Sequence, residues 1–245
     1  MKNKALISSL LFVLVSCSDN FDIDVSFGET ESINPGIDDA FVSTYKPMES
    51  QPILFKSANI YDGLGGEYRN YDLLLSDGKI EEIGKSITLV GVLVIDATNK
   101  WITPGIIDIH SHMGVYSAPS VSTSSDGNEA TAPVTAEVWA EHSLWTQDPQ
   151  FALALKGGVT AFHVLPGSAN LFGGRGVTLK NVWSRTVQGM KFPAAPYTLK
   201  MACGENPKRV YGSDQEPSTR MGNVAGYRAA WIKAKEYKDL SLIHI

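Results

Sequence analysis

Short apolar runs separated by turn-forming residues fill the stretch 52–104, and this pattern predicts β-strands. The run ILFKSANIYD, residues 53–62, predicts one strand. The run YDLLLSDGKIEEIG, residues 71–84, predicts two strands joined at an Asp-Gly pair, which is typical of a tight hairpin turn. The run GVLVIDATNKWITPG, residues 91–105, adds a further strand. None of these runs has room for a helix, so the sequence predicts a small β domain over residues 52–104.

Longer connections separate the apolar runs of residues 105–239. The runs are GIIDIHSH (105–112), GGVTAFHVLPG (157–167), GVTLKNV (176–182) and APYTLKMACG (195–204). Two connections, residues 135–158 and 219–237, have the apolar spacing of helices. Strands that alternate with helices predict parallel βα units, whose strands are buried on both faces. The sequence therefore predicts an α/β fold with about four βα units.

The number of units limits the architecture. A closed (β/α)8 barrel takes about 250 residues, and residues 105–239 are about half of that. This part is therefore either a smaller open sheet or the first half of a TIM barrel. Residues 240–245 follow the second predicted helix without a cap or turn signal, so we interpret them as an anomalous tail and expect the chain to end within its fold.

The first 17 residues have the pattern of a signal peptide. Two lysines precede the apolar run ALISSLLFVLVS, residues 5–16, which is shorter than the roughly 20 residues that a membrane-spanning helix needs. The run ends in LVSC, which resembles a bacterial lipobox and implies cleavage before Cys17 and acylation of that residue. The alternative is an ordinary secretory signal with an incidental cysteine. Residues 18–51 are acidic and polar, so we expect a flexible tether and a protein lipid-anchored at the bacterial cell envelope, facing the periplasm or the exterior.

The composition adds one exclusion. The chain has 245 residues, of which 43% are hydrophobic, and this is typical of a globular protein. Its net charge is −5 and it has no run of basic residues, so we do not expect a nucleic-acid partner.

Two histidines end the first apolar run of the second region. Asp108, His110 and His112 alternate along the predicted strand, so their side chains share one face. The histidines lie at the carboxyl end of the strand, where α/β enzymes bind their ligands. Two imidazoles at this spacing can converge on one divalent ion, and imidazole suits zinc, iron and nickel. We therefore predict His110 and His112 as metal ligands, with Asp108 as a hydrogen-bond acceptor behind them.

The sequence WITPGIIDIHSHMG, residues 101–114, resembles the first barrel strand of the amidohydrolase superfamily. The segments DGKIEEIG and VIDATNKWITPG before it are similar to the N-terminal half of the β-sandwich beside that barrel. Within the superfamily, GSANLFGGRGV (167–177) and KMACGENPKRVYG (200–212) resemble imidazolonepropionase-like members. The resemblance implies one or two divalent metal ions, with zinc expected, and hydrolysis of non-peptide carbon–nitrogen bonds by metal-activated water. The implied substrate is a small molecule with an amide-like or cyclic C–N bond.

The resemblance also implies that a later carboxylate or carboxylated lysine completes the metal site. Glu205 follows the fourth predicted strand and Lys200 lies within it. Because the two are five residues apart, a regular strand would point them to opposite faces. We favour Glu205, since it lies at the ligand-binding end and needs no modification. The family's general-base aspartate comes from a later strand that this chain does not contain, so we expect an N-terminal part of the enzyme that is inactive alone.

Two further residues are candidates for contact with the substrate. Arg175 belongs to GGRG, which either presents backbone N–H groups to an anion or forms a tight turn. Glu129 lies in the polar loop 124–137. His142 and His163 are expected to pack rather than to bind metal. The alternative function is a non-catalytic lipoprotein, a binding module or an unstable fragment, because half a barrel leaves strand edges unpaired.

Overall fold

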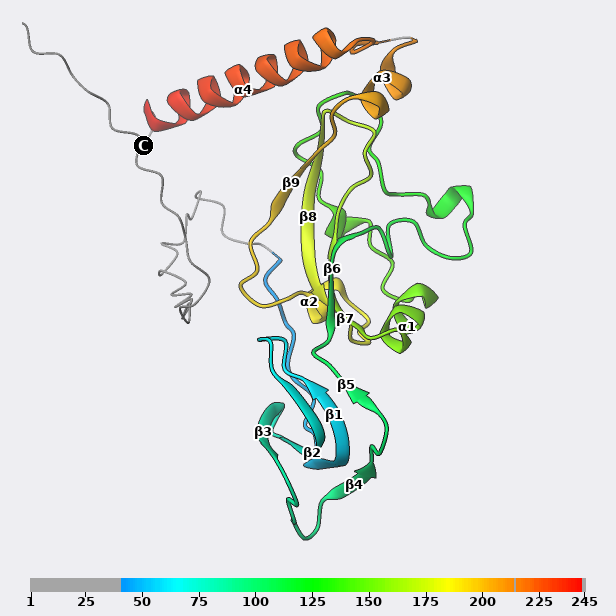
Figure 1. The fold of residues 1–245 in the computed structure, drawn as a ribbon. Coiled ribbons are helices and arrows are strands. Elements are labelled where there is room, and N and C mark those ends of the chain that lie inside the picture. Colours follow the sequence, from blue (N-terminus) through cyan, green and yellow to red (C-terminus); the bar gives the residue numbers. More distant parts are fainter. Residues whose placement is uncertain (1–40, 214, 244–245) are drawn as a thin grey trace, which may run out of the picture. The chain divides into compact units, whose positions relative to one another are not determined.

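The computed structural model describes residues 41–213 and 215–243 (Figure 1). The predicted signal peptide, Cys17 and residues 18–40 of the predicted tether lie outside these ranges. Within them, no helix combines the length and the apolar character that a membrane span requires.

The first sheet contains five strands. They are β1 (Ile53–Tyr61), β2 (Glu67–Ser76), β3 (Lys79–Gly84), β4 (Leu93–Asp96) and β5 (Trp101–Ile102). The order is β3-β2-β1-β4, and β5 also pairs with β1. The predicted strands are confirmed, although the run 91–105 contains two strands instead of one. The described residues of this region form one sheet.

The hairpin between β2 and β3 follows directly from its sequence. Asp77 and Gly78 have φ angles of 50° and 71°, so both adopt the left-handed conformation of a tight turn. The flanking residues Ser76 and Lys79 pair across the two strands. The predicted Asp-Gly turn is therefore confirmed.

Asp72, in β2, is a buried carboxylate that ties this sheet together. It accepts hydrogen bonds from the Lys56 ammonium and from the backbone N–H groups of Ser57 and Ile87, the last two at 2.9 Å. Burial by itself would raise the pKa of Asp72, but the hydrogen bonds from Lys56, Ser57 and Ile87 outweigh it and hold the pKa below its usual value.

We expect Asp72→Asn to lower the unfolding free energy by about 1–2 kcal/mol at pH 7. The folded-state pKa lies below the unfolded value of about 3.9, so the carboxylate stabilises the fold above pH 3.9. This contribution is lost as the pH falls through the folded-state pKa. Urea titrations should therefore show the difference between wild type and variant shrinking below pH 4. A difference that stays constant from pH 7 to pH 3 would contradict this assignment.

The second sheet contains four strands in the order β6-β7-β8-β9 (Figure 1). They are β6 (Ile106–Ser111), β7 (Val159–Val164), β8 (Phe172–Lys180) and β9 (Thr198–Met201). β6 and β7 are parallel, as predicted, but β8 runs antiparallel to both β7 and β9. The prediction of four successive parallel units is therefore wrong. The connection between β7 and β8, residues 165–171, is shorter than the dozen or so residues that a parallel crossover needs.

Helices and short helical turns connect the strands. They are η1 (Ser122–Ser124), η2 (Ala140–His142), α1 (Pro149–Lys156), α2 (Val187–Met190), α3 (Glu205–Tyr211) and α4 (Arg220–Ile243). The predicted helix 135–158 is therefore largely wrong, because only α1 and the short η2 form there. Pro149 suits the first helical position. It has no N–H that could bond to the carbonyl oxygen four residues earlier, so α1 begins at this residue.

The predicted helix 219–237 is confirmed as α4, but it continues to Ile243. Part of the predicted tail 240–245 is thus helical. The aromatic rings of Tyr227 and Trp231 on α4 meet Phe172 of β8 edge to face, at centroid distances of 5.8 and 5.6 Å.

One face of the second sheet is covered by the largest core cluster. Phe162 of β7 is fully buried and stacks on Phe151 of α1 at 5.2 Å. β6 is different, because it lies at the edge of the sheet and its Ile107 and Ile109 side chains are 65% and 78% exposed. The expectation that every strand is buried on both faces is therefore wrong for β6, which no described residue covers on its outer side.

The described end of the predicted tether contacts the region between β8 and β9. Ser43 Oγ donates a hydrogen bond to the Lys191 carbonyl oxygen at 2.7 Å, and the Thr44 N–H donates to the Gln188 carbonyl oxygen at 3.0 Å. This part of residues 18–51 is therefore docked, in contrast to the expected free tether.

Candidate metal centre

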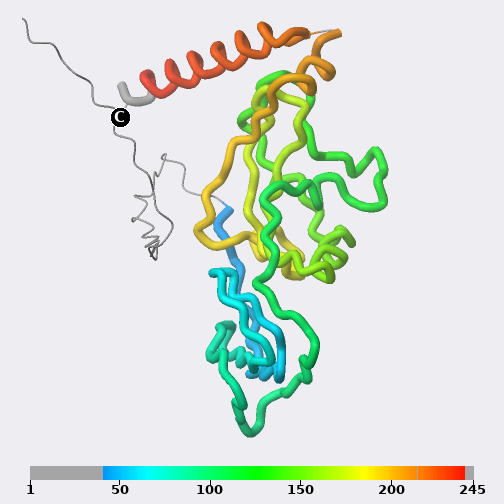
Figure 2. Tube along the Cα trace, viewed as in Figure 1, coloured from blue at the N-terminus to red at the C-terminus, as the bar shows by residue number. Residues whose placement is uncertain are grey.

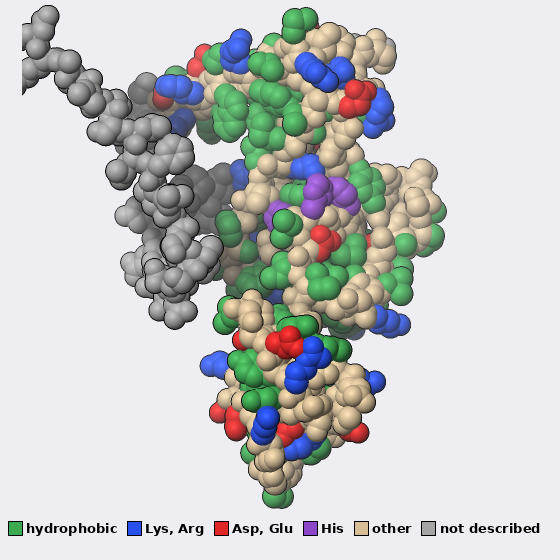
Figure 3. Space-filling view, viewed as in Figure 1, with side chains coloured by type: hydrophobic (Ala, Val, Ile, Leu, Met, Phe, Trp, Pro, Cys, Tyr) green, Lys and Arg blue, Asp and Glu red, His purple; other side chains and the backbone are tan. Residues whose placement is uncertain are grey.

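The two histidines of the predicted site come from the end of β6. His110 lies within the strand and His112 follows its last residue, Ser111. The two imidazole rings lie edge to face, with centroids 5.2 Å apart and planes at 85°. Figure 3 shows histidine side chains gathered at the surface of this face, with a basic side chain beside them.

The hydrogen bond of His112 fixes which ring nitrogen is free. Its Nδ1 lies 2.8 Å from the Leu165 carbonyl oxygen, at the start of the connection after β7. A carbonyl oxygen only accepts, so Nδ1 carries the proton and the lone pair is on Nε2. A ring that donates one N–H to a backbone carbonyl and offers the other nitrogen is typical of metal-binding histidines.

Lys200, from β9, is the basic group beside His110. Its Nζ lies 3.3 Å from His110 Nε2, and the residue is only 8% exposed. The Lys200 charge, burial and the neighbouring His112 together lower the pKa of His110, against a smaller opposing effect of Asp108. Burial in turn lowers the pKa of Lys200. Since the ammonium donates, the His110 lone pair also lies on Nε2.

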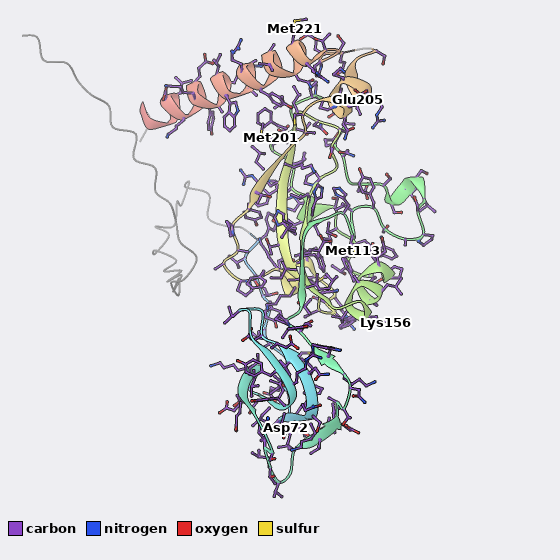
Figure 4. The ribbon with its side chains drawn as sticks, in the orientation of Figure 1. Asp72, Met113, Lys156, Met201, Glu205 and Met221 are labelled. Atoms are coloured by element: carbon purple, nitrogen blue, oxygen red, sulfur yellow. The ribbon has the colours of Figure 1, made fainter. Side chains whose placement is uncertain are left out.

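The structure reverses our preference between Glu205 and Lys200. The Glu205 side chain is 74% exposed, and its Oε2 lies 3.4 Å from Lys208 Nζ within α3. The strand alternation that we assumed ends at Met201, and Gly204, with φ of 86°, turns the chain into α3. Figure 4 accordingly separates Glu205 from Met113, the residue after His112. Lys200 is the residue that the fold brings to the histidines.

Asp108 does not contact either imidazole directly. Its Oδ1 accepts a hydrogen bond from the backbone N–H of His110 at 3.1 Å. We predicted that Asp108 accepts a hydrogen bond from an imidazole ring, whereas it accepts one from the backbone of the same strand.

The two predicted substrate-contact residues lie elsewhere on the second sheet and its loops. The Arg175 guanidinium lies over the Trp139 ring at 4.4 Å. Residues 173–176 lie inside β8 and the Arg175 N–H donates to the Val138 carbonyl oxygen, so GGRG forms neither an anion-binding loop nor a tight turn. Glu129 lines a cavity of about 470 Å³.

This cavity adjoins the histidine site. Its walls include Trp139, Pro166 and Gly173. A Cβ atom added to Gly173 would lie 3.7 Å from both the Lys200 and the Pro166 side chains. Gly173 therefore lines the cavity and also lies beside the Lys200 side chain.

The two other histidines in the described part of the chain, His142 and His163, have different partners. The His142 ring stacks on Trp139, with centroids 5.5 Å apart. Both ring nitrogens of His163 are hydrogen-bonded, Nδ1 to Thr178 Oγ1 at 2.9 Å and Nε2 to Thr198 Oγ1 at 2.6 Å. These contacts are those of packing residues.

Two residues near the site were missed in the sequence. Asp148 is buried and accepts a hydrogen bond from the Gly114 N–H, two residues after His112, at 2.9 Å. An aspartate directly before a proline is a helix-start signal, which would have identified it. Tyr116 packs edge to face on His112 at 5.7 Å, and no pattern in the sequence indicates this contact.

The imidazole nitrogens of His110 and His112 are suitable ligands for a divalent ion, although two ligands are few. Within the described ranges, no cluster of three or more His, Cys, Asp or Glu residues is arranged to hold a metal. His110 and His112 each offer an Nε2 lone pair, and Lys200 lies against the first of them. A metal centre built here would therefore use the two imidazoles and a modified Lys200.

No protein-family model matches the chain, but it is similar to several individual proteins. Amidohydrolase tasK of Hapsidospora irregularis is 34% identical over 188 residues, which are 71% of this chain and 19% of tasK. The dihydroorotase of Thermoanaerobacter sp. (strain X514) is 35% identical over 80 residues, 33% of this chain and 18% of that enzyme.

A solved structure agrees over most of the chain. The crystal structure of an amidohydrolase from Thermotoga maritima MSB8 matches with a TM-score of 0.71 and 42% identity, over 78% of this chain and 49% of that one. The chain thus spans less than a fifth of the two curated relatives and about half of the solved one. The similarity in sequence and fold to these amidohydrolases, over most of the chain, supports its placement in the amidohydrolase superfamily.

Proposed function

We propose that the chain is part of a metal-dependent hydrolase that cleaves non-peptide C–N bonds in small molecules with an amide-like or cyclic bond. The observation that carries the proposal is the grouping of His110, His112 and Lys200 at the end of β6, with both imidazole lone pairs on Nε2. Relatives named as an amidohydrolase and a dihydroorotase support the reaction class. The imidazolonepropionase-like subgroup remains our assignment from the sequence.

His110 and His112 would hold one or two divalent ions, with zinc expected from the imidazole donors. When bound, such an ion supplies Lewis acidity and a water molecule of lowered pKa. The backbone carbonyl of Leu165 keeps the proton on His112 Nδ1, so Nε2 is available without a change of tautomer.

Lys200 would complete the site as a carbamate. Its amine nitrogen attacks the carbon of CO2, the N–C bond forms and the nitrogen releases a proton, which leaves a carboxylate-like group. Among the described residues, none forms an ion pair with Lys200, so its buried charge lacks compensation there. A carbamate bound to metal would replace this charge with oxygen ligands. This assignment supersedes our preference for Glu205.

The proposal leaves proton transfer to an aspartate that the family resemblance predicts on a later strand, so we expect no hydrolase activity from this chain alone. We also propose that acylated Cys17 anchors the protein to the bacterial cell envelope.

Metal binding by the metal-free chain tests the proposal. We expect equilibrium dialysis with Co²⁺ to show weak binding that bicarbonate strengthens at least tenfold, because CO2 converts Lys200 into a ligand. His110→Ala combined with His112→Ala should abolish binding, and Lys200→Met should abolish only the effect of bicarbonate. His142→Ala removes an imidazole outside the site and should change neither.

Equal Co²⁺ binding by the wild type and the double histidine variant would overturn the metal site. In that event the non-catalytic alternative, a lipoprotein binding module, would account for the chain better.

A further inference from the structure

We propose that Tyr116 is a positioning residue that holds the His112 ring in its metal-binding orientation, in a slot that two glycines leave open. This inference rests on the proposed metal site and adds to it a residue that acts through His112 without touching the metal.

The contact between the two rings is direct. Tyr116 and His112 lie edge to face, with centroids 5.7 Å apart and planes at 83°. The Tyr116 N–H donates to the His112 carbonyl oxygen at 3.0 Å, so one turn of backbone fixes the separation of the two residues. The imidazole is thus held at Nδ1 by the Leu165 carbonyl and against Tyr116 by ring packing. Edge-to-face packing of this kind favours one ring orientation.

The slot for the tyrosine explains two glycines. A Cβ atom on Gly127 would lie 2.2 Å from Tyr116 Cζ, and one on Gly167 would lie 2.4 Å from Asn128 Nδ2 and 2.6 Å from the Tyr116 hydroxyl oxygen. Neither glycine is among those with a left-handed φ, so their backbone conformation does not require glycine. The Gly167 N–H donates to the Gly127 carbonyl oxygen at 2.6 Å, which holds the two sides of the slot together. The space that Tyr116 and its partner Asn128 occupy accounts for both glycines.

The hydroxyl end of Tyr116 is also fixed. The Asn128 side-chain amide donates to the Tyr116 hydroxyl oxygen, and Asn128 Oδ1 accepts from the Ala169 N–H at 3.2 Å. Asn128 lines the 470 Å³ cavity, so Tyr116 contacts a residue of the cavity wall at its hydroxyl end and His112 at its ring. The ring is therefore held at both ends, and the orientation of His112 does not depend on a bound metal.

The first readout is the tautomer of His112 in the full, metal-free chain, measured by ¹⁵N NMR of the imidazole nitrogens. In the wild type we expect the proton on Nδ1. Tyr116→Phe keeps the ring and should keep this tautomer. Tyr116→Leu should give a mixture of tautomers, because the ring then loses one of its two supports.

The second readout is Co²⁺ affinity in bicarbonate. Loss of a residue that orients a metal ligand typically costs 10- to 100-fold in affinity, so we expect a loss in this range for Tyr116→Leu and at most twofold for Tyr116→Phe. Gly167→Ala, whose methyl group would push against the Tyr116 hydroxyl and its partner Asn128 without removing the ring, should resemble Tyr116→Leu. The matched control is Tyr211→Phe. Tyr211 lies on α3, and its hydroxyl donates to the Ala132 carbonyl oxygen, so removing this hydroxyl should leave both readouts unchanged.

A folded Tyr116→Leu or Gly167→Ala variant with the wild-type tautomer and Co²⁺ affinity would overturn the proposal. If Tyr116→Leu does not fold, Gly167→Ala and the retention of both readouts in Tyr116→Phe decide it. A wild type that binds no Co²⁺ would refute the proposed metal site, whereas the tautomer measurement would still test the role of Tyr116.

Discussion

Lys191→Met should lower the unfolding free energy by about 3–5 kcal/mol, the cost of leaving one member of a buried ion pair without its partner. Lys191 Nζ lies 3.1 Å from Glu141 Oε2, and the two side chains are 5% and 0% exposed. The Tyr197 hydroxyl donates to Glu141 Oε1 at 2.9 Å, and Lys191 Nζ also donates to the Phe41 carbonyl oxygen at 2.6 Å. The variant would therefore leave a buried carboxylate unpaired and remove the side-chain contact with the Phe41 carbonyl oxygen.

Urea unfolding of four proteins checks this prediction. Adding Glu141→Gln to Lys191→Met should recover part of the loss, because the stranded charge is removed as well. Lys235→Met breaks an exposed i,i+4 pair with Asp239 and should cost less than about 0.5 kcal/mol. A loss below 1 kcal/mol for Lys191→Met would show that the ion pair is not a main support of the fold.

Asp148→Ala should cost about 3 kcal/mol, because one buried carboxylate serves both the start of α1 and the loop after β6. Its oxygens accept from the Gly114 N–H at 2.9 Å, the Ala118 N–H at 3.3 Å, and the Gln150 N–H and side-chain amide at 3.0 and 2.9 Å. Alanine removes this acceptor from the buried Gly114 N–H and from the part-buried Ala118 and Gln150 N–H groups, whereas the Gln150 side-chain amide keeps the Tyr116 carbonyl oxygen at 2.9 Å. The loop from Gly114 to Ala118 carries Tyr116, so the loss should reach the candidate site.

Hydrogen exchange and thermal unfolding measure the two consequences separately. We expect faster exchange of the Gly114 amide and a lower melting temperature in Asp148→Ala. Asp148→Asn keeps one oxygen acceptor and should show an intermediate loss of stability. Unchanged exchange at Gly114 in a destabilised Asp148→Ala variant would confine the role of this residue to the helix cap.

Local patterns in the sequence predicted the local structure well. Alternating apolar residues identified β1, the Asp77-Gly78 pair identified the hairpin, and the periodicity of residues 219–237 identified α4. These features depend on interactions between residues close together in the chain, so a single sequence contains the information. The position of the histidine pair at the end of β6 follows from the same local pattern.

The periodicity of apolar residues could not predict the direction of β8 or the choice between Lys200 and Glu205. The run that becomes β8 is equally apolar in a parallel or an antiparallel sheet, and the length of the connection 165–171 decides its direction. The comparison of Lys200 with Glu205 assumed one continuous strand, whereas the strand ends at Met201. The docking of Ser43 and Thr44 involves partners more than 140 residues away, which composition cannot reveal.

The antiparallel placement of β8 has a consequence for the order of folding. β8 pairs with β7 and with β9 across two shorter connections, residues 165–171 and 181–197. Closing these connections costs less chain entropy than closing a longer one. β6 joins β7 only after the long connection 112–158 closes, which Figure 2 shows as the green segment that leaves the sheet after β6 and returns at β7. We therefore expect the antiparallel strands to pair first and β6 to be added late. The histidines and Lys200 would then meet only in the final stage of folding, so that partly folded chains do not present the assembled site to metal ions.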